Sequence, residues 1–373
     1  MSKRIAFALA ACALTGACKP NSGDPPAPTH APSTPAAAVP AAAVTTVPGF
    51  LKGQLHLHSN RSGDSDTPPD DVANWYRGRG YDFIVFTDHN RITDTEDRGG
   101  MLTLPGVELT QNVRTCEPPP RPGHACLLHV DALLVSAPPS DGLLRWPEPA
   151  PTHRVDLYGR GVDLALELGG IAQLNHPNFH FAADLEQVVA MAKRGLGMIE
   201  VANMAVDSQN EGDASHPSTE ALWDAALSRG AKLYATATDD AHHYADADRV
   251  RAAGETAYVG DLGWVMVRAE KTPNAIRAAL TRGDFYATTG LLLSRVELSP
   301  ESIAVEVAQD PARGGVVLEV IGEGGRVLAR DASPVMRFDP RAASGSYLRV
   351  RAIAADGRRA WTQPIWRAPT TAR

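Results

Sequence analysis

The chain has 373 residues, with 36 basic and 43 acidic side chains and a formal net charge of −7. This length predicts more than one domain, and a hydrophobic content of 43% is enough to form buried cores. The acidic balance argues against duplex DNA or RNA as a partner. Four Cys and no apolar run near about 18 residues exclude a disulfide-dense miniprotein and a multispan membrane protein.

Residues 1–18 are predicted to be an export signal. A short basic segment, Ser2-Lys3-Arg4, precedes an apolar, Ala-rich stretch that ends near Gly16, which is typical of a secretory signal peptide. Cys12 and Cys18 each follow small residues, as at a lipoprotein cleavage site, and we favour Cys18 as the lipidated residue. The alternative is a cleaved, soluble periplasmic protein. Both interpretations predict export to a bacterial envelope, with membrane contact only through the lipid anchor.

Residues 19–48 are predicted to form a disordered tether. Pro and Ala supply 16 of these 30 residues, and the segment has no aromatic side chain. Such a composition buries too little apolar surface to fold, and its prolines keep the chain extended.

From residue 49 the sequence alternates between predicted strands and helices. Residues 53–58 alternate like a strand, residues 69–79 have helical spacing, and residues 82–87 form an apolar strand run. Further strand candidates are 104–109, 127–135, 170–174, 198–201 and 232–236, with helical patterns between several of them at 155–168, 182–194 and 219–229. This alternation predicts an α/β fold with a mostly parallel sheet that closes into a barrel, covering residues 49–290.

After residue 290 the pattern changes to short alternating strands with Gly-rich turns. We expect strands at 291–298, 302–307, 315–321, 326–329, 347–354 and 361–366. The sequence therefore predicts a small C-terminal β-sandwich-like domain, residues 291–373. It contains no His or Cys, so we interpret it as a stabilising cap, with a carbohydrate- or surface-binding module as the alternative.

Metal-binding residue types stand at the predicted strand ends. They are His56, His58, Asp88, His89, Glu108, His129, His176, Asp240 and His242. A barrel brings its strand ends together, so these residues are predicted to form one cluster. Imidazole and carboxylate ligands suit Zn, Mn or Fe, and the set is larger than one ion needs.

Five motifs in order resemble those of the polymerase and histidinol phosphatase (PHP) superfamily. They are His56-Leu57-His58, Thr87-Asp88-His89-Asn90, Gly106-Val107-Glu108, Asn175-His176-Pro177 and Asp240-Ala241-His242. Three further segments are similar to the carbaryl hydrolase-like branch: Asn60-Arg61-Ser62, His129-Val130-Asp131-Ala132-Leu133 and Phe285-Tyr286-Ala287-Thr288-Thr289-Gly290. The resemblance covers roughly residues 50–290 and implies a distorted (β/α)7-type barrel with two or three divalent ions.

The resemblance also implies a role for each ligand. The first ion would be held by His56, His58, Glu108 and Asp240, and Glu108 would bridge to a second ion held by His129 and His176. A third ion would be held by His89, His242 and an acid after the first motif. The family often places this acid where Gly63 stands here, so we predict Asp64 instead, with Asp66 as the alternative.

The predicted chemistry is hydrolysis by a hydroxide held between the ions. Divalent ions lower the pKa of a shared water and stabilise charge on the reacting oxygens. Glu108 is therefore counted as catalytic, and His180 and His243, close to predicted ligands, are candidate general acids. The candidates to accept a hydrogen bond from the second nitrogen of metal-binding His are Asp88, Asp239 and Glu200.

The expected partner is a small-molecule substrate. Phosphoester cleavage ranks first because it is the commonest use of the superfamily, and carbamate, ester or amide cleavage is the alternative that the nearer branch suggests. For a phosphoester we predict Arg61 and Arg91 as binding residues, with Arg121 nearby, whereas Trp75, Phe179 and Phe181 are candidates for an apolar pocket. An envelope protein that binds metal or ligand without turnover is the alternative from another class.

Cys116 and Cys126 flank a Pro-rich segment between Glu108 and His129. In an oxidising envelope these two Cys are predicted to form a disulfide, and soft-metal binding by the thiols is the alternative. A loop closed in this way could shape access to the metal centre.

Overall fold

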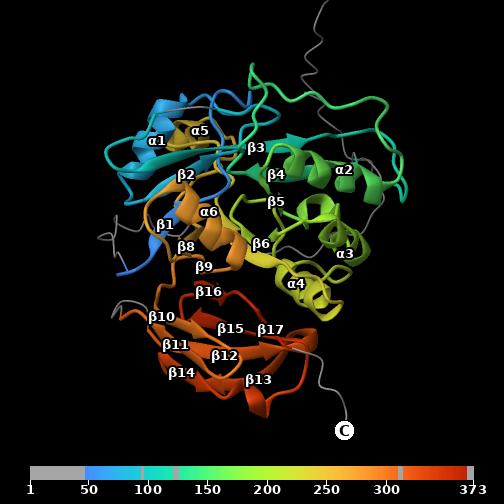
Figure 1. Cartoon of the computed structure of the whole chain (residues 1–373). Coiled ribbons are helices and arrows are strands. Elements are labelled where there is room, and N and C mark those ends of the chain that lie inside the picture. Colours follow the sequence, from blue (N-terminus) through green and yellow to red (C-terminus); the bar gives the residue numbers. More distant parts are fainter. Residues whose placement is uncertain (1–46, 94–95, 121–125, 310–313, 368–373) are drawn as a thin grey trace, which may run out of the picture. The chain divides into compact units, whose positions relative to one another are not determined.

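Figure 1 shows the computed structural model, which describes residues 47–93, 96–120, 126–309 and 314–367. These residues all belong to one unit of the chain, residues 44–373. The predicted signal peptide with Cys12 and Cys18, most of the predicted tether, and Arg121 lie outside the described residues.

The main element is a fourteen-stranded mixed sheet. Its central strands follow one another in chain order, and in Figure 1 their colours run from blue to yellow. Their bounds are β1 (Leu51–Gln54), β2 (Phe83–Phe86), β3 (Leu102–Thr110), β4 (His129–Leu133), β5 (Ile171–Leu174), β6 (Met198–Asn203) and β7 (Tyr234–Thr238). Strands β2, β4 and β6 are buried along their whole length, as expected for apolar runs that are covered on both faces.

Strand direction changes within this sheet. Strands β1, β2 and β3 are parallel, β4 is antiparallel to both β3 and β5, and β5, β6 and β7 are again parallel. On the other side of β1, β8 (Trp264–Val267) and β9 (Phe285–Thr288) add antiparallel strands. An isolated bridge joins Leu57 to Ala241, so the segments that follow β1 and β7 lie side by side.

The predicted (β/α)7-type barrel with a separate β-sandwich-like domain is wrong. The described residues are mostly β, with a fourteen-stranded mixed sheet, a second sheet and six α-helices. No helix of the described chain separates β2 from β3 or β3 from β4. Antiparallel neighbours such as β3 and β4 need no crossover helix, and an apolar run predicts a strand without fixing its direction or its neighbour.

The α-helices lie between or beside these strands (Figure 1). Their bounds are α1 (Pro69–Arg77), α2 (Arg154–Glu167), α3 (Leu185–Arg194), α4 (Thr219–Ser228), α5 (Ala247–Ala252) and α6 (Pro273–Arg282). Helix α3 shows how the sequence sets these limits, because Asp184 and Gln187 form a capping box at its start. Gly195 ends α3 in a left-handed conformation that favours glycine. Among the described helices, none has the length and apolar character needed to cross a membrane.

The C-terminal strands continue the main sheet. Strand β16 pairs with β9 and links β15, β12 and β13 to it, with β17 beside β15, whereas β10, β11 and β14 form a separate three-stranded sheet. Their bounds are β10 (Leu293–Leu298), β11 (Ile303–Val307), β12 (Val316–Gly322), β13 (Arg326–Asp331), β14 (Val335–Phe338), β15 (Tyr347–Ala354), β16 (Arg359–Thr362) and β17 (Ile365–Trp366). The described residues also form three short 3-10 turns, η1 (Phe179–Phe181), η3 (Glu323–Gly325) and η4 (Pro340–Ala342).

A buried ion network joins α4 to β15. The Arg349 guanidinium is fully buried, and its Nη2 lies 2.6 Å from both Asp224 Oδ2 and Glu220 Oε1. The Tyr347 hydroxyl donates to Asp224 Oδ1 at 2.8 Å. The C-terminal strands are therefore held by charged contacts as well as by their shared apolar core.

Candidate metal centre

The predicted metal ligands come together at one edge of the sheet. They lie after β1 (His56, His58 and Asp64), after β2 (His89), in β3 (Glu108), at the start of β4 (His129), after β5 (His176) and after β7 (Asp240 and His242). His129 was expected at the end of its strand, but it is the first residue of β4. Because β4 runs antiparallel to β3 and β5, its first residue reaches the edge where its neighbours carry Glu108 and His176.

Glu108 lies between two sets of imidazoles. Its Oε1 lies 2.8 Å from His129 Nδ1 and 3.5 Å from His176 Nε2. Its Oε2 lies within 4 Å of three further imidazoles, those of His89 at 2.8 Å, His58 at 3.5 Å and His56 at 3.7 Å. The close packing of β3 that positions Glu108 depends on Gly106, because an added Cβ there would lie 2.8 Å from the Phe86 carbonyl oxygen.

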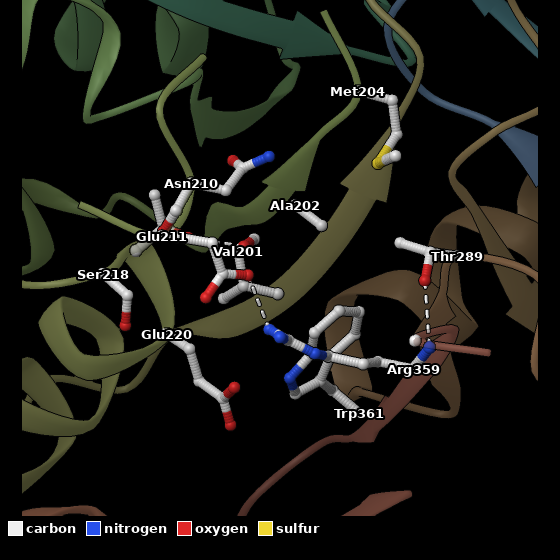
Figure 2. Close-up of a pocket in the computed structure, with 12 residues that line it drawn as sticks. Val201, Ala202, Met204, Asn210, Glu211, Ser218, Glu220, Thr289, Arg359 and Trp361 are labelled. Atoms are coloured by element: carbon white, nitrogen blue, oxygen red, sulfur yellow. Dashed lines mark hydrogen bonds and ion pairs between the residues drawn. The ribbon is translucent and has the colours of Figure 1, made fainter. Parts of the chain in front are cut away.

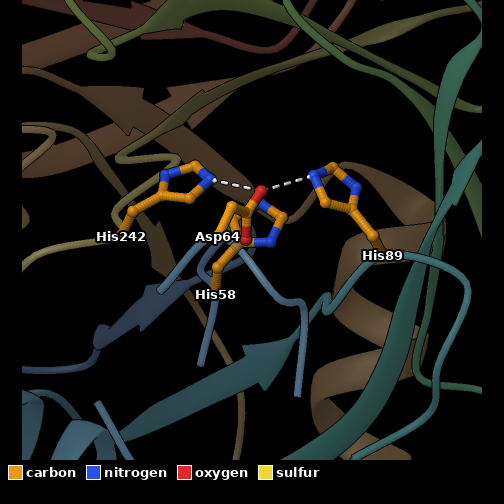
Figure 3. A group of neighbouring side chains, drawn as sticks. All are labelled: His58, Asp64, His89 and His242. Atoms are coloured by element: carbon orange, nitrogen blue, oxygen red, sulfur yellow. Dashed lines mark ion pairs between the residues drawn. The ribbon is translucent and has the colours of Figure 1, made fainter. Parts of the chain in front are cut away.

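Asp64 joins a second group with three imidazoles (Figure 3). Its Oδ2 lies 2.9 Å from His89 Nε2 and 3.3 Å from His242 Nε2, and His58 completes the group. The other acid considered from the sequence, Asp66, is 90% exposed and pairs with Arg249 at 3.7 Å. Asp64 is therefore the acid that lies beside the histidines.

Asp240 lies beside two of the histidines that also surround Glu108. Its Oδ1 lies 3.1 Å from His58 Nε2 and 3.3 Å from His56 Nε2. Both Asp240 and His176 have positive φ values, 51° and 24°, in a region that non-glycine residues rarely adopt. Backbone strain of this kind is typical of functional sites.

Several sets of these side chains could hold a metal ion. In each set the His, Asp and Glu ligand atoms lie within 4.8 Å of one another; the sets are His58-Asp64-His89-His242, His56-His58-Glu108, Glu108-His129-His176 and His56-Asp131-Glu200. The buried His129 Nε2 has no hydrogen-bond partner among the described residues. An unpaired buried nitrogen is costly unless a ligand completes it, so the donor set fits a bound metal.

The charges of the cluster are strongly coupled. Burial disfavours the ionised form of Glu108, but His89, His129 and His56 hold its pKa well below its usual range. Burial likewise opposes protonation of His89, yet Glu108 and Asp64 raise its pKa to about 11. For His58, burial and the neighbouring His242 lower the pKa to about 4. The site thus contains an imidazolium and a neutral imidazole side by side, around ionised carboxylates.

Glu200 contacts two of the histidines. Its Oε1 lies 2.8 Å from His56 Nδ1, and its Oε2 accepts the His176 backbone N–H at 2.6 Å. The other two candidates for this role have different partners. Asp88 accepts from the Ser59 backbone and hydroxyl, and Asp239 accepts the backbone N–H groups of residues 261–263.

Three residues that were assigned no role from the sequence also contact the cluster. Asp131 lies 3.8 Å from His56 Nδ1, and Asn175 donates to Glu108 Oε1 at 3.1 Å and to Asp131 Oδ1 at 2.9 Å. The Ser62 hydroxyl lies 2.8 Å from His58 Nδ1. Period-two alternation along β4 places Asp131 on the same face as His129, which is the signal that could have identified it.

The cluster opens into a cavity of about 290 Å³. The lining residues that are not predicted ligands are Phe179, Ala205, Asp207, Ser208, His243 and Tyr258. Of the two candidate general acids, His243 lines this cavity and His180 does not. Arg61 and Arg91 are also absent from the lining. The predicted phosphoester-binding arginines therefore do not reach the described cavity wall.

A second cavity of about 170 Å³ lies between β6, α4 and β16 (Figure 2). An ion pair of 2.8 Å between Arg359 and Glu211 crosses it. None of the four metal-binding sets of the described residues contributes a side chain to its lining.

The structure contains the predicted disulfide between Cys116 and Cys126. Both half-cystines are buried, and the backbones of Val113 and Cys126 pair with each other. The disulfide therefore constrains the segment that leads from Glu108 on β3 to His129 on β4.

A search of protein-family models finds none that matches this chain, and a search of curated proteins finds no significant match.

Proposed function

We propose that this protein is a metal-dependent hydrolase with two or three divalent ions, Zn, Mn or Fe. The observation that carries the proposal is the position of Glu108. Each of its two carboxylate oxygens faces a different set of imidazoles, as a carboxylate shared by two ions requires. The order of the motifs in the sequence supports the proposed relation to the PHP superfamily.

The ligands divide among the proposed ions as follows. His56, His58, Glu108 and Asp240 would hold the first ion, Glu108, His129 and His176 would hold the second, and Asp64, His89 and His242 would hold the third. Such ions supply activation of water and stabilisation of negative charge on a reacting oxygen.

The remaining chemistry belongs to the protein. Glu200 fixes the orientation of His56 through the 2.8 Å contact with Nδ1, which directs Nε2 toward the cluster. His243 accepts the Tyr258 backbone N–H at Nδ1, so in its neutral form it carries its proton on Nε2. We assign His243 the role of hydrogen-bond donor, through Nε2–H, to the leaving-group oxygen.

Two classes of substrate follow from this proposal. The first is a phosphoester, which the resemblance ranks highest. The second is a carbamate or carboxylic ester, and the absence of Arg and Lys from the described cavity lining favours it. A dianionic phosphate would gain charge stabilisation from the ions alone.

Metal content and hydrolysis of the purified protein test the proposal together. We expect two or three ions per chain by inductively coupled plasma mass spectrometry, and turnover of an aryl phosphodiester or an aryl carbamate. Glu108→Ala should lose at least one ion and more than about 100-fold in hydrolysis, because it removes the shared ligand. Glu186→Ala is the matched control, since Glu186 is exposed and pairs with Arg229 outside the cluster.

The outcomes separate the alternatives. A protein that takes up no ion after incubation with Zn or Mn would contradict the metal centre. Bound ions without turnover of either substrate class would support the other interpretation, a metal-binding protein without catalysis. We further propose export to the bacterial envelope, which cell fractionation with metabolic lipid labelling of wild type and Cys18→Ala would test.

A further inference from the structure

The lining of the cavity contains a carboxylate that belongs to none of the metal-binding sets. Asp207 lines the cavity together with Tyr258, and it belongs to none of the four sets. The described lining contains no Arg or Lys, and no ion pair of Asp207 is found within the described part of the chain. Its negative charge is therefore free to act on whatever enters the cavity.

Asp207 lies on a turn that the Asn203 side chain stabilises. The Asn203 side-chain oxygen accepts from the Ala205 backbone at 3.0 Å and from the Ser208 hydroxyl at 2.5 Å. The Asn203 amide nitrogen in turn donates to Asp240 Oδ2 at 3.2 Å. The same side chain thus fixes a proposed metal ligand and the turn that carries Asp207.

Tyr258 stands beside this carboxylate. Its hydroxyl donates to Asp207 Oδ2 at 3.1 Å, and its ring centroid lies 5.5 Å from that of His242. A neutral aromatic face next to a fixed carboxylate is the environment that binds organic cations.

We propose that Asp207 and Tyr258 recognise an alkylammonium group on the substrate, in the part of the cavity that these two residues line. This names the substrate class of the site and rests on the proposed hydrolase, because the ammonium group belongs to the molecule that is cleaved. The ions would take the oxygens of the scissile group, and Asp207 with Tyr258 would take the cation.

Binding of phenyltrimethylammonium to the metal-loaded protein tests the cation site without any turnover. By isothermal titration calorimetry, Asp207→Asn should weaken binding about 5-fold, since it removes a partly exposed opposite charge. Tyr258→Leu should weaken it by a similar factor, whereas Tyr258→Phe, which keeps the ring, should stay within about 2-fold. Asp248→Asn is the matched control, because Asp248 is an exposed carboxylate on α5 that is absent from the cavity lining.

Hydrolysis of two isosteric esters then tests whether the cation belongs to the substrate. The pair is 4-nitrophenyl 4-(trimethylammonio)butanoate and 4-nitrophenyl 5,5-dimethylhexanoate, which differ in charge but not in shape. After division by the uncatalysed rates, the cationic ester should have the higher kcat/KM. Asp207→Asn should reduce that preference about 5-fold, and added salt should reduce it in wild type.

No saturable binding of phenyltrimethylammonium, or equal binding by wild type and Asp207→Asn, would overturn the proposal. Binding that depends on Asp207 in a protein that cleaves neither ester, phosphodiester nor carbamate would instead overturn the hydrolase and leave the cation site standing. Turnover of both esters without a preference that depends on Asp207 would retain the hydrolase and reject the ammonium substrate.

Discussion

Glu108 and Glu200 are both buried glutamates beside histidines, but their partners differ. Both oxygens of Glu108 face imidazoles at the centre of the cluster. Glu200 instead lies behind His56 and also accepts from Thr238 and Asn203. At the scale of single residues, these partners support different proposed roles: Glu108 as the shared ligand, and Glu200, although it belongs to the set His56-Asp131-Glu200, as the residue that orients His56 and His176.

Glu200→Gln tests this distinction. The amide keeps the size of the side chain but replaces a charged acceptor of His56 and His176, so we expect metal affinity to fall about 10- to 100-fold. Competition with a chromogenic chelator would measure the change, and Glu186→Gln provides the surface control. If the affinity of Glu200→Gln equals that of wild type, Glu200 does not orient the proposed ligands.

At the scale of elements, strand direction determines where the candidate metal ligands lie. The antiparallel direction of β4 brings His129 and Asp131 to the cluster from the start of a strand rather than from its end. The connections between strands also constrain the cluster, because the disulfide closes the segment between β3, which carries Glu108, and β4, which carries His129. Likewise, the Arg349 network ties α4 to β15.

Removing the Arg349 side chain should destabilise the protein strongly. Arg349→Ala leaves the buried Asp224 with the Tyr347 hydroxyl but no cation, and Glu220 with Arg351 alone, which we expect to cost about 3–5 kcal/mol of unfolding free energy. Arg229→Ala breaks an exposed ion pair and should cost less than about 1 kcal/mol. Chemical denaturation of both variants measures the difference, and equal losses would show that burial does not set the strength of the Arg349 network.

At the scale of the whole molecule, the charged cluster links metal binding to pH. In the ion-free protein the pKa of His89 is raised from its usual 6.5 to about 11, so its protonated form contributes stability below pH 6.5 that is lost as the pH rises toward 11. The carboxylate of Asp64 has a lowered pKa and stays ionised over this range. An ion bound by His89 must therefore displace a proton at neutral pH.

Metal affinity should consequently rise with pH. For each proton displaced, we expect up to about a tenfold increase per pH unit between pH 6.5 and pH 8.5. Chelator competition at several pH values, with calorimetry in two buffers of different ionisation enthalpy, measures the affinity and the number of protons released. An affinity that does not change with pH would mean that His89 and His242 are not ligands.

Removal of the ions should also lower the thermal stability. Ligands that bind only the folded state stabilise it by mass action, so chelation should lower Tm and added Zn or Mn should restore it. In differential scanning calorimetry, the chelator should lower the Tm of the Glu108→Ala variant less than the Tm of wild type, because the variant has already lost at least one ion.

The sequence by itself determined which residues are candidate metal ligands and where most strands lie. Apolar runs predict strands because the local pattern of side chains determines local conformation, but the meeting of the nine predicted ligands depends on the pairing of strands that are distant in the sequence. Strand direction, the continuation of the sheet into the C-terminal strands and the positions of Asp131, Asn175 and Asp207 beside the cluster were decided only by the tertiary structure. These depend on which distant segments pair with one another, and an apolar run carries no information about its partner.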